Sequence, residues 1–249
     1  MEETCMEIII AKNYQEMSEK AGEIFNQAVE DNPSIVLGLA TGSTPEGLYA
    51  KMVEAYEEGR TDYSLVHSFN LDEYLNIDLE NEQSYHYFMN HHLFSKVNIK
   101  KENTHFPSLD QEGSAKHYDQ AIEDKGGLDL LVVGMGVNGH IAFIEPSEES
   151  MVYTHIANLH PSTIEVNARF FEKREDVPTQ AITMGYKSIM GAKKLIVLAS
   201  GASKKEPVYR LLKGDVISTK WPITLALIHP NCTLICDEES AIKWYEENR

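Results

Sequence analysis

The sequence predicts an α/β fold with a doubly wound, mostly parallel sheet and helices on both faces. Three apolar runs indicate this fold, at residues 34–40 (SIVLGLA), 128–133 (LDLLVV) and 194–200 (KLIVLAS). Such continuous Leu, Ile and Val content is typical of strands buried on both faces, as in a parallel sheet covered by helices. Helical segments alternate with these runs and no repeat or linker interrupts the chain, so we expect one domain over residues 1–249.

The other elements follow from turn residues and local periodicity. Pro33 restarts the chain before the first apolar run, and Pro45 and Pro161 suit the first turns of helices. We expect further strands at 7–11, 68–71 and 233–236, an extended segment at 152–159, and helices at 14–29, 45–57, 83–94, 114–125, 161–171, 222–229 and 240–247, with a short segment and a helix within 179–192.

The composition excludes several classes of partner. Of the 249 residues, 39 are acidic and 22 are Lys or Arg, which gives a formal net charge of −17 and argues against nucleic acid or an anionic membrane as a partner. The N-terminal residues MEETCMEIII have no basic segment of a signal peptide, and no apolar run is long enough to span a membrane.

Cysteine usage points to the cytoplasm. The chain has three cysteines, Cys5, Cys232 and Cys236, which indicate no disulfide framework and fit a reducing compartment. Cys232 and Cys236 would lie on the same face of a strand, where we interpret them as small buried hydrophobic residues. A zinc site is the weaker alternative, because no second pair of ligands lies nearby.

An anion-binding turn is predicted where the run at 34–40 ends. The chain passes from that strand through Gly42, Ser43 and Thr44 into a helix that starts at Pro45, with Thr44 as its expected N-cap. Exposed N–H groups and the helix dipole would then face one point. The turn lacks the Lys of a Walker A loop, and an ordinary capped turn is the alternative. A second turn of this kind, residues 201–204, carries Lys204 on the first turn of the following helix.

The stretch at 134–146, GMGVNGHIAFIEP, brings His140 and Glu145 to the carboxyl end of a buried strand, where ligands bind in open α/β sheets. Its glycines match the spacing of the dinucleotide-binding motif. That motif requires a long helix, however, and Pro146 would interrupt one after about two turns. We therefore expect the glycines to turn the backbone tightly so that His140 faces a pocket.

Acidic residues follow the strand expected at 68–71. Asp72 and Glu73 are candidates for a general base, and the alternative is that both are solvated loop residues. His86, His91 and His92 are expected on the surface of the helix at 83–94, since neighbouring helical histidines do not face one metal ion.

The sequence resembles the glucosamine-6-phosphate deaminase family. The resemblance rests on GLATGSTPEGLY, FNLDEY with the downstream QSYHYFM, GMGVNGHIAFIEP, NARFF and DVPTQAITMGYKSIM, which cover most of the chain in the family's order. It implies a modified Rossmann-like fold and aldose–ketose isomerisation of glucosamine 6-phosphate coupled to loss of ammonia, which gives fructose 6-phosphate. No cofactor or metal is implied, and we expect the hydrolase and isomerase classes of enzyme, in amino-sugar catabolism.

The resemblance also implies roles for individual residues. Asp72 aligns with the base that moves the C2 proton toward C1, His140 with the ring-opening acid and base, and Glu145 with the carboxylate that supports it. Asn138 stands where the family often has Asp, and it can orient His140 by hydrogen bonding. The phosphate grip is implied for five residues: Gly42, Ser43, Thr44, Arg169 and Lys204.

Two departures from the family pattern leave alternatives open. Ile144 replaces the usual Asn, and it either faces the substrate or packs beneath the loop. The segment at 151–158 (MVYTHIAN) lacks the Arg and Lys that bind an effector in regulated members. A galactosamine-6-phosphate deaminase, a 6-phosphogluconolactonase and a non-catalytic phosphosugar sensor remain alternatives. The oligomeric state, including a homo-oligomer, is left open.

Overall fold

The computed structural model describes residues 6–159, 164–165, 168 and 173–248. Seven strands form a large sheet: β1 (Met6–Ala11), β2 (Val36–Leu39), β3 (His67–Asn70), β5 (Thr104–His105), β6 (Leu130–Gly134), β9 (Lys194–Ala199) and β10 (Cys232–Asp237). Three form a small sheet: β4 (Asp72–Tyr74), β7 (His155–Asn158) and β8 (Gln180–Thr183). The helix expected at 161–171 lies largely outside the described residues.

The α-helices are α1 (Tyr14–Asp31), α2 (Glu46–Glu57), α3 (Tyr85–His92), α4 (His117–Asp124), α6 (Tyr186–Met190), α7 (Lys205–Lys213) and α8 (Ile242–Glu247). Short 3₁₀ helices are η1 (Phe94–Lys96), η2 (Lys101–Asn103), η4 (Arg174–Asp176), η5 (Ala202–Lys204) and η6 (Pro222–Ile228). The helix expected at 222–229 is thus a 3₁₀ helix. None of the helices among the described residues is long and apolar enough to cross a membrane.

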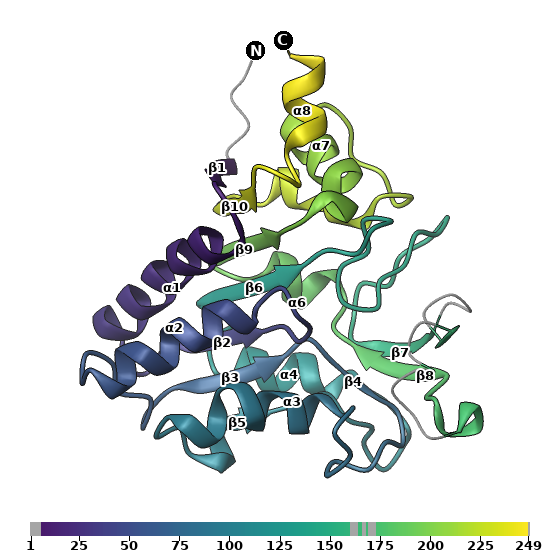
Figure 1. Ribbon diagram of the computed structural model, residues 1–249. Coiled ribbons are helices and arrows are strands. Elements are labelled where there is room, and N and C mark those ends of the chain that lie inside the picture. The colour runs from purple at the N-terminus through teal and green to yellow at the C-terminus, as the bar shows by residue number, and fades with distance from the viewer. Residues whose placement is uncertain (1–5, 160–163, 166–167, 169–172, 249) are drawn as a thin grey trace.

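The large sheet is parallel in each of its pairings, in the order β1-β10-β9-β6-β2-β3-β5. Helices α1 and α2 pack side by side on one face, and α4 and α6 lie on the other (Figure 1). This confirms the doubly wound α/β fold. After β2, the chain first adds β3 and β5 on one side of β2, and later adds β6, β9 and β10 on its other side. The direction of winding therefore reverses at β2 and β6, where ligands of such sheets bind.

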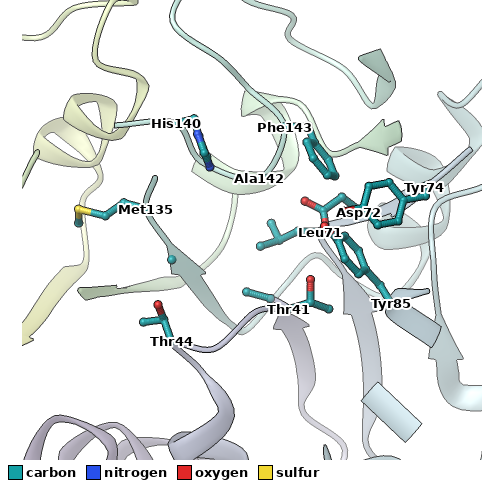
Figure 2. A pocket seen from close by; sticks show the side chains of 12 residues that line it. Thr41, Thr44, Leu71, Asp72, Tyr74, Tyr85, Met135, His140, Ala142 and Phe143 are labelled. Atoms are coloured by element: carbon teal, nitrogen blue, oxygen red, sulfur yellow. The ribbon is translucent and has the colours of Figure 1, made fainter. Parts of the chain in front are cut away.

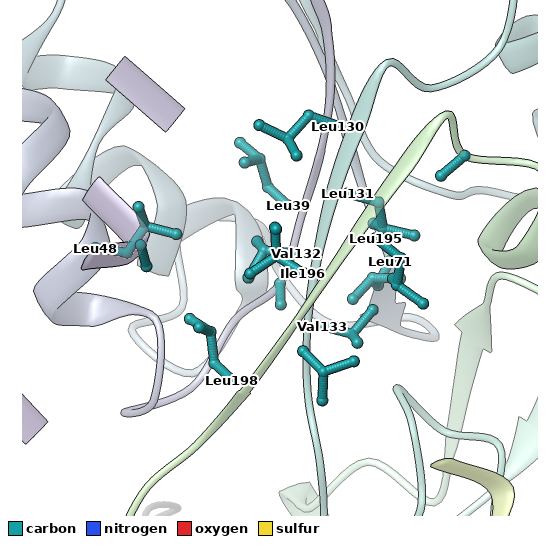
Figure 3. Packing of buried hydrophobic residues seen from close by; sticks show 14 of the residues in the cluster. Leu39, Leu48, Leu71, Leu130, Leu131, Val132, Val133, Leu195, Ile196 and Leu198 are labelled. Atoms are coloured by element: carbon teal, nitrogen blue, oxygen red, sulfur yellow. The ribbon is translucent and has the colours of Figure 1, made fainter. Parts of the chain in front are cut away.

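The predicted apolar runs form the centre of the core. Leu131, Val132, Val133, Leu195 and Ile196 are fully buried between the two helical layers (Figure 3). A strand covered on both faces has no side that water reaches, which explains why these runs do not alternate with polar residues. The rigid centre fixes where the carboxyl ends of β2, β3 and β6 lie.

The small antiparallel sheet, whose order is β4-β8-β7, was not expected from the sequence. Leu71 connects the two sheets directly. Its N–H donates to Leu39 O of the large sheet (3.0 Å), and its carbonyl accepts a bond from Met184 N after β8 (2.8 Å). Asp72, expected just after the strand at 68–71, begins the separate strand β4, with Leu71 alone between it and β3.

Candidate active site

A cavity of about 230 Å³ opens at the carboxyl ends of β2, β3 and β6, beside the reversal of winding. Its side chains come from both sheets and from the loop after β6, and Figure 2 shows Asp72 and His140 entering it from different elements. The lining residues are Ala40, Thr41, Thr44, Leu71, Asp72, Tyr74, Tyr85, Gly134, Met135, His140, Ala142 and Phe143.

Asp72 is the buried acid of this cavity. Its backbone pairs with Thr183 of β8, and the residue is 6% exposed. Burial raises the pKa of the Asp72 carboxyl, and together with the negative charge of neighbouring Glu73 it brings that pKa to about 8. A carboxylate that is kept from water in this way is a strong base once it is ionised.

Glu73, the other candidate base, has a structural role. Its carboxylate accepts hydrogen bonds from the backbone N–H groups of Tyr74 (2.8 Å), Tyr85 (3.0 Å) and His86 (3.0 Å), and it also contacts His86 Nδ1 at 2.7 Å. These contacts hold the start of α3 against β4. The prediction of a purely surface role for His86 is wrong, because its ring bonds to buried Glu73 and stacks on Phe106.

Three aromatic rings surround Asp72 on the side away from the large sheet. The ring centroids of Tyr74 and Tyr85 are 4.9 Å apart, and Phe143 lies 5.8 Å from Tyr74 and 6.2 Å from Tyr85 (Figure 2). Burial, followed by neighbouring Tyr74 and Asp72, raises the pKa of Tyr85 well above its ordinary value. These rings were not among the site residues expected from the sequence, although Tyr85 lies within the motif QSYHYFM.

The loop after β6 turns tightly because of its glycines. Gly136 N donates to His140 O (2.9 Å), and a Cβ added to Gly136 would lie 2.2 Å from the His140 ring. A glycine is needed there for the imidazole to lie over the backbone. An isolated bridge between Ile141 and Ile144 follows in place of a long helix, so the structure does not support the dinucleotide-binding alternative.

Asn138 joins Glu145 to the His140 backbone. Its Nδ2 donates to Glu145 Oε2 (2.8 Å), and its Oδ1 accepts the His140 N–H (3.2 Å). His140 Nδ1 lies 3.5 Å from Glu145 Oε1, which is within ion-pair range but longer than a good hydrogen bond. The three predicted residues are therefore brought together, with Asn138 acting on both of the others.

The turn after β2 has a different cap from the one expected. Pro45 occupies the cap position of α2 with no side-chain cap bond, so the prediction of Thr44 as N-cap is wrong. Thr44 lines the cavity instead, together with Thr41. Tyr14 of α1 fastens the turn, because its hydroxyl donates to Ser43 O (2.9 Å) and accepts from Gly47 N (2.8 Å).

A second hollow adjoins the same turn. Ser43 and Thr44 line it together with Ser200, which follows β9. Asp237 fixes this part of the chain by accepting hydrogen bonds from Ser200 Oγ and Gly201 N. The two strand-to-helix turns singled out in the sequence therefore lie next to each other. Gly42 lies within the first turn in the left-handed region, at φ +99°.

Lys204 ends η5 immediately before α7, four positions after Ser200. Burial lowers the pKa of its ammonium group. Within the described part of the chain Lys204 has no carboxylate at ion-pair distance, unlike the neighbouring helix residue Arg210, which pairs with Glu206. Arg169, the other predicted cation, lies outside the described residues.

Ile144 packs inward. It is 4% exposed, belongs to the main hydrophobic core and does not line the cavity. The structure thus supports the packing alternative for this residue over the substrate-facing one. A branched aliphatic side chain is the chemically expected occupant of such a position.

No group of three or more His, Cys, Asp or Glu side chains in the described residues is arranged to hold a metal ion. Cys232 and Cys236 are free and buried on β10, as their spacing predicted. Burial raises the pKa of each thiol to about 12, so both remain protonated and unreactive at neutral pH.

Known proteins are similar to this chain over most of its length. Residues 11–235 match the family model described as glucosamine-6-phosphate isomerases/6-phosphogluconolactonase. The glucosamine-6-phosphate deaminase of Thermoanaerobacter pseudethanolicus is 48% identical over 239 residues, which cover 95% of this chain and 94% of the relative. The deaminase of Clostridium tetani is 49% identical over 239 residues, with coverage of 95% and 99%.

Solved structures give the same grouping. A monomeric glucosamine-6-phosphate deaminase is similar with a TM-score of 0.89 and 34% identity, over 95% of this chain and 99% of that one. A 6-phosphogluconolactonase from Thermotoga maritima has a TM-score of 0.70 at 20% identity, over 93% and 99% of the two chains, and shows the shared fold alone. The fold and site therefore define an α/β enzyme of sugar phosphates. The chain belongs to the glucosamine-6-phosphate isomerase/6-phosphogluconolactonase family.

The family also corrects one expectation. The family description names isomerases, and the two relatives given above, at 48% and 49% identity, are named deaminases. The assignment to the hydrolase class is therefore wrong for this chain, while the isomerase and deaminase assignments stand.

Proposed function

We propose that this protein converts glucosamine 6-phosphate to fructose 6-phosphate and ammonia. The observation that carries the proposal is the placement of Asp72, a buried acid within an aromatic wall, in the same cavity as His140 and beside the turn that we predict to bind an anion. Aldose–ketose isomerisation requires a base for a carbon-bound proton, a group that opens the sugar ring and a grip on the phosphate. The cavity brings candidates for all three together.

Asp72 is assigned the carbon-bound proton. It removes the proton from C2 of the open-chain sugar, which gives an enolamine, and delivers a proton to C1, which leaves an imine at C2. Water then adds to C2 and ammonia leaves, so that the C2–N bond is replaced by the C2–O bond of the ketose. Burial disfavours the ionised carboxylate and thereby strengthens it as a base. The aromatic wall limits the access of water to the carboxylate, so hydration does not weaken it as a base.

His140 is assigned to ring opening. An imidazole can take the proton of the anomeric hydroxyl and deliver one to the ring oxygen near neutral pH. Glu145 lies 3.5 Å from its Nδ1 and would stabilise the imidazolium that forms between these transfers. Asn138 holds Glu145 in place through a 2.8 Å hydrogen bond.

The phosphate is assigned to the turn after β2 and to Lys204. Gly42, Ser43 and Thr44 offer backbone and hydroxyl groups at the start of α2, where a helix N-terminus favours an anion. Lys204 is half-buried and is not neutralised by a carboxylate within the described chain. Arg169 is proposed as a further phosphate ligand by motif.

The alternatives differ in what they require. A lactonase has to activate water against an ester and needs no base for a carbon-bound proton, so the enclosed setting of Asp72 favours the deaminase. A non-catalytic sensor has no use for Asp72, His140 and Glu145 around one cavity. The galactosamine substrate differs in one hydroxyl and remains the nearest rival.

The proposal extends to the compartment, the domain organisation and the ligand of the protein. Free, buried Cys232 and Cys236 fit the reducing cytoplasm. The seven-stranded core and the small sheet share Leu71 as a direct connection, which fits the expected single domain. A small phosphorylated amino sugar is the proposed ligand, and the chain acts alone or as a homo-oligomer.

The test is ammonia release from glucosamine 6-phosphate, with galactosamine 6-phosphate and 6-phosphogluconolactone as comparators. The proposal predicts the highest kcat/KM for the gluco substrate. Lactone hydrolysis without ammonia release would indicate the lactonase. Calorimetric binding of the phosphosugars without turnover would identify a sensor.

A further inference from the structure

The outer side of the catalytic loop is covered by a segment remote in sequence, residues 218–223. The Trp221 ring lies against Gly139, and a Cβ added to Gly139 would be 2.8 Å from Trp221 Cε3. Ile223 N, two residues later, donates to Gly139 O at 2.8 Å. Gly139 immediately precedes His140, so these contacts act on the backbone that carries the imidazole.

The same segment also holds the far end of the loop. Ser147 N donates to Thr219 O at 3.2 Å, and Lys220 forms an ion pair with Glu148. Residues 139–147, which contain His140 and Glu145, are therefore attached at both ends to one segment. The pairing is independent of the bonds that Asn138 makes inside the loop.

Trp221 is itself fixed from behind. The Arg210 guanidinium lies 4.1 Å from the ring centroid of Trp221, in cation–π geometry. Arg210 is held by Glu206 at 3.0 Å on α7, and Trp221 N donates to Ser218 O at 2.9 Å. The indole is thus a rigid support rather than a loose surface side chain.

We propose that Trp221 is a positioning residue for His140. Gly136 lies under the imidazole on the inner side of the loop, and Trp221 blocks Gly139 from the outer side. Gly139 has φ +80°, a conformation that glycine adopts without strain. Because a glycine backbone can also leave this conformation easily, a contact from outside the loop helps to keep His140 in one orientation. A displacement of about 1 Å at a catalytic group can cost about 10²-fold in rate.

This inference rests on the proposed function, because it assigns His140 a step in the reaction. A positioning role predicts an effect on kcat, since the phosphate turn and Asp72 lie on other elements and still bind substrate. A role in stability alone would lower the amount of folded enzyme and leave the kcat of the folded fraction unchanged.

The experiment compares Trp221→Ala, Trp221→Phe and Trp244→Phe in the full chain. These are the two tryptophans of the protein, and Trp244 lies on α8 away from the loop. We expect Trp221→Ala to lose 10- to 100-fold in kcat per folded molecule with KM within about threefold of wild type. Trp221→Phe keeps a ring over Gly139 and should recover most of the loss, and Trp244→Phe should match wild type.

A kcat for Trp221→Ala within twofold of wild type would overturn the inference. So would a Trp221→Phe variant as slow as Trp221→Ala, because a ring in contact with Gly139 is what the inference requires. Activity is expressed per folded molecule, from the circular dichroism melting curve of each variant. The wild type is assayed alongside: wild-type ammonia release with an unaffected Trp221→Ala variant rejects this inference alone, whereas a wild type that releases no ammonia rejects the proposed function.

Discussion

The two sides of the cavity provide opposite environments for proton transfer. On one side, Asp72 lies in a short strand behind aromatic rings, and burial raises its pKa to about 8. On the other, His140 and Glu145 stand on a loop with side chains 33% and 20% exposed. A carbon-bound proton needs the stronger base that a poorly hydrated carboxylate provides, while the protons of hydroxyl and ring oxygens can be moved by a more exposed imidazole. The difference indicates a division of labour between the two sides.

One residue connects the two environments. Thr183 pairs with Asp72 across the small sheet, and its hydroxyl accepts the N–H of Phe143 from the loop at 3.2 Å. The small sheet therefore sets the distance between the base and the loop that carries His140. The large sheet fixes the floor of the cavity, and the small sheet fixes the position of Asp72 relative to the loop that carries His140.

The largest expected effect is on the Asp72 side. Asp72→Asn should lower kcat by about 10³- to 10⁴-fold, because an amide cannot accept the carbon-bound proton. Binding of fructose 6-phosphate, measured by calorimetry, should remain close to wild type, since the phosphate contacts are untouched. Near-normal turnover in this variant would remove Asp72 from the role of base.

A smaller loss is expected on the loop side. His140→Asn should lower kcat by about 10²-fold, near the low end for a general acid–base group, because sugar rings also open spontaneously. The measurement is steady-state ammonia release. If His140→Asn proves more severe than Asp72→Asn, the proposed division of labour is reversed.

The phosphate grip should act mainly through binding. Lys204→Ala, and by motif Arg169→Ala, should each cost about 1.5–3 kcal/mol of charge-assisted contact, seen in kcat/KM for the phosphorylated sugar. Lys205→Ala is the matched control, because Lys205 is the exposed neighbour of Lys204. Unphosphorylated glucosamine should be spared, and an equal loss with that sugar would show that Lys204 does not meet the phosphate.

The burial of Asp72 also predicts a pH dependence of stability. The carboxyl is protonated in both states below about pH 4, the usual value for Asp in an unfolded chain. As the pH rises from there toward the folded-state pKa of about 8, the unfolded chain gives up its proton first, so wild-type stability is progressively lost. Asp72→Asn does not titrate, so its stability should rise relative to that of the wild type by about 1.4 kcal/mol for each pH unit between the two pKa values.

Urea unfolding at pH 4, 6.5 and 9 measures this difference. The advantage of Asp72→Asn should be largest at pH 9 and should shrink as the pH falls toward 4. A pH-independent difference between the two proteins would show that Asp72 is not the titrating group.

The smallest effect concerns Ile144. Because this residue packs in the core, Ile144→Val should cost about 0.5–1.5 kcal/mol of stability by loss of one methylene. Its selectivity between glucosamine 6-phosphate and galactosamine 6-phosphate should equal that of the wild type. A changed ratio of the two kcat/KM values would favour the substrate-facing alternative.

Much of the large sheet was predictable because its central strands have a recognisable local sequence pattern. Residues 34–40, 128–133 and 194–200 are continuous apolar runs, and β2, β6 and β9 form within them. The loop at 134–146 was also readable, since its glycines and Pro146 exclude a long helix. In each case the signal lies within a dozen residues.

The Asp72 side was predictable in chemistry but not in structure. β4 is three residues long and contains two acids, and its partner β8 lies more than 100 positions later in the sequence. No local periodicity can report such a pairing. The different roles of Asp72 and Glu73 also depend on contacts with α3. Both are acids at adjacent positions, so the sequence alone does not show that Glu73 bonds the start of α3 while Asp72 faces the cavity.

The division of labour is tested most directly by running the reaction in deuterium oxide and following the reacting carbons of the sugar by NMR. The account predicts that Asp72→Asn incorporates no solvent deuterium at C1 or C2 while it still binds the phosphosugar, and that His140→Asn incorporates it in proportion to its residual turnover. Deuterium incorporation by Asp72→Asn at a rate near that of the wild type would contradict the account.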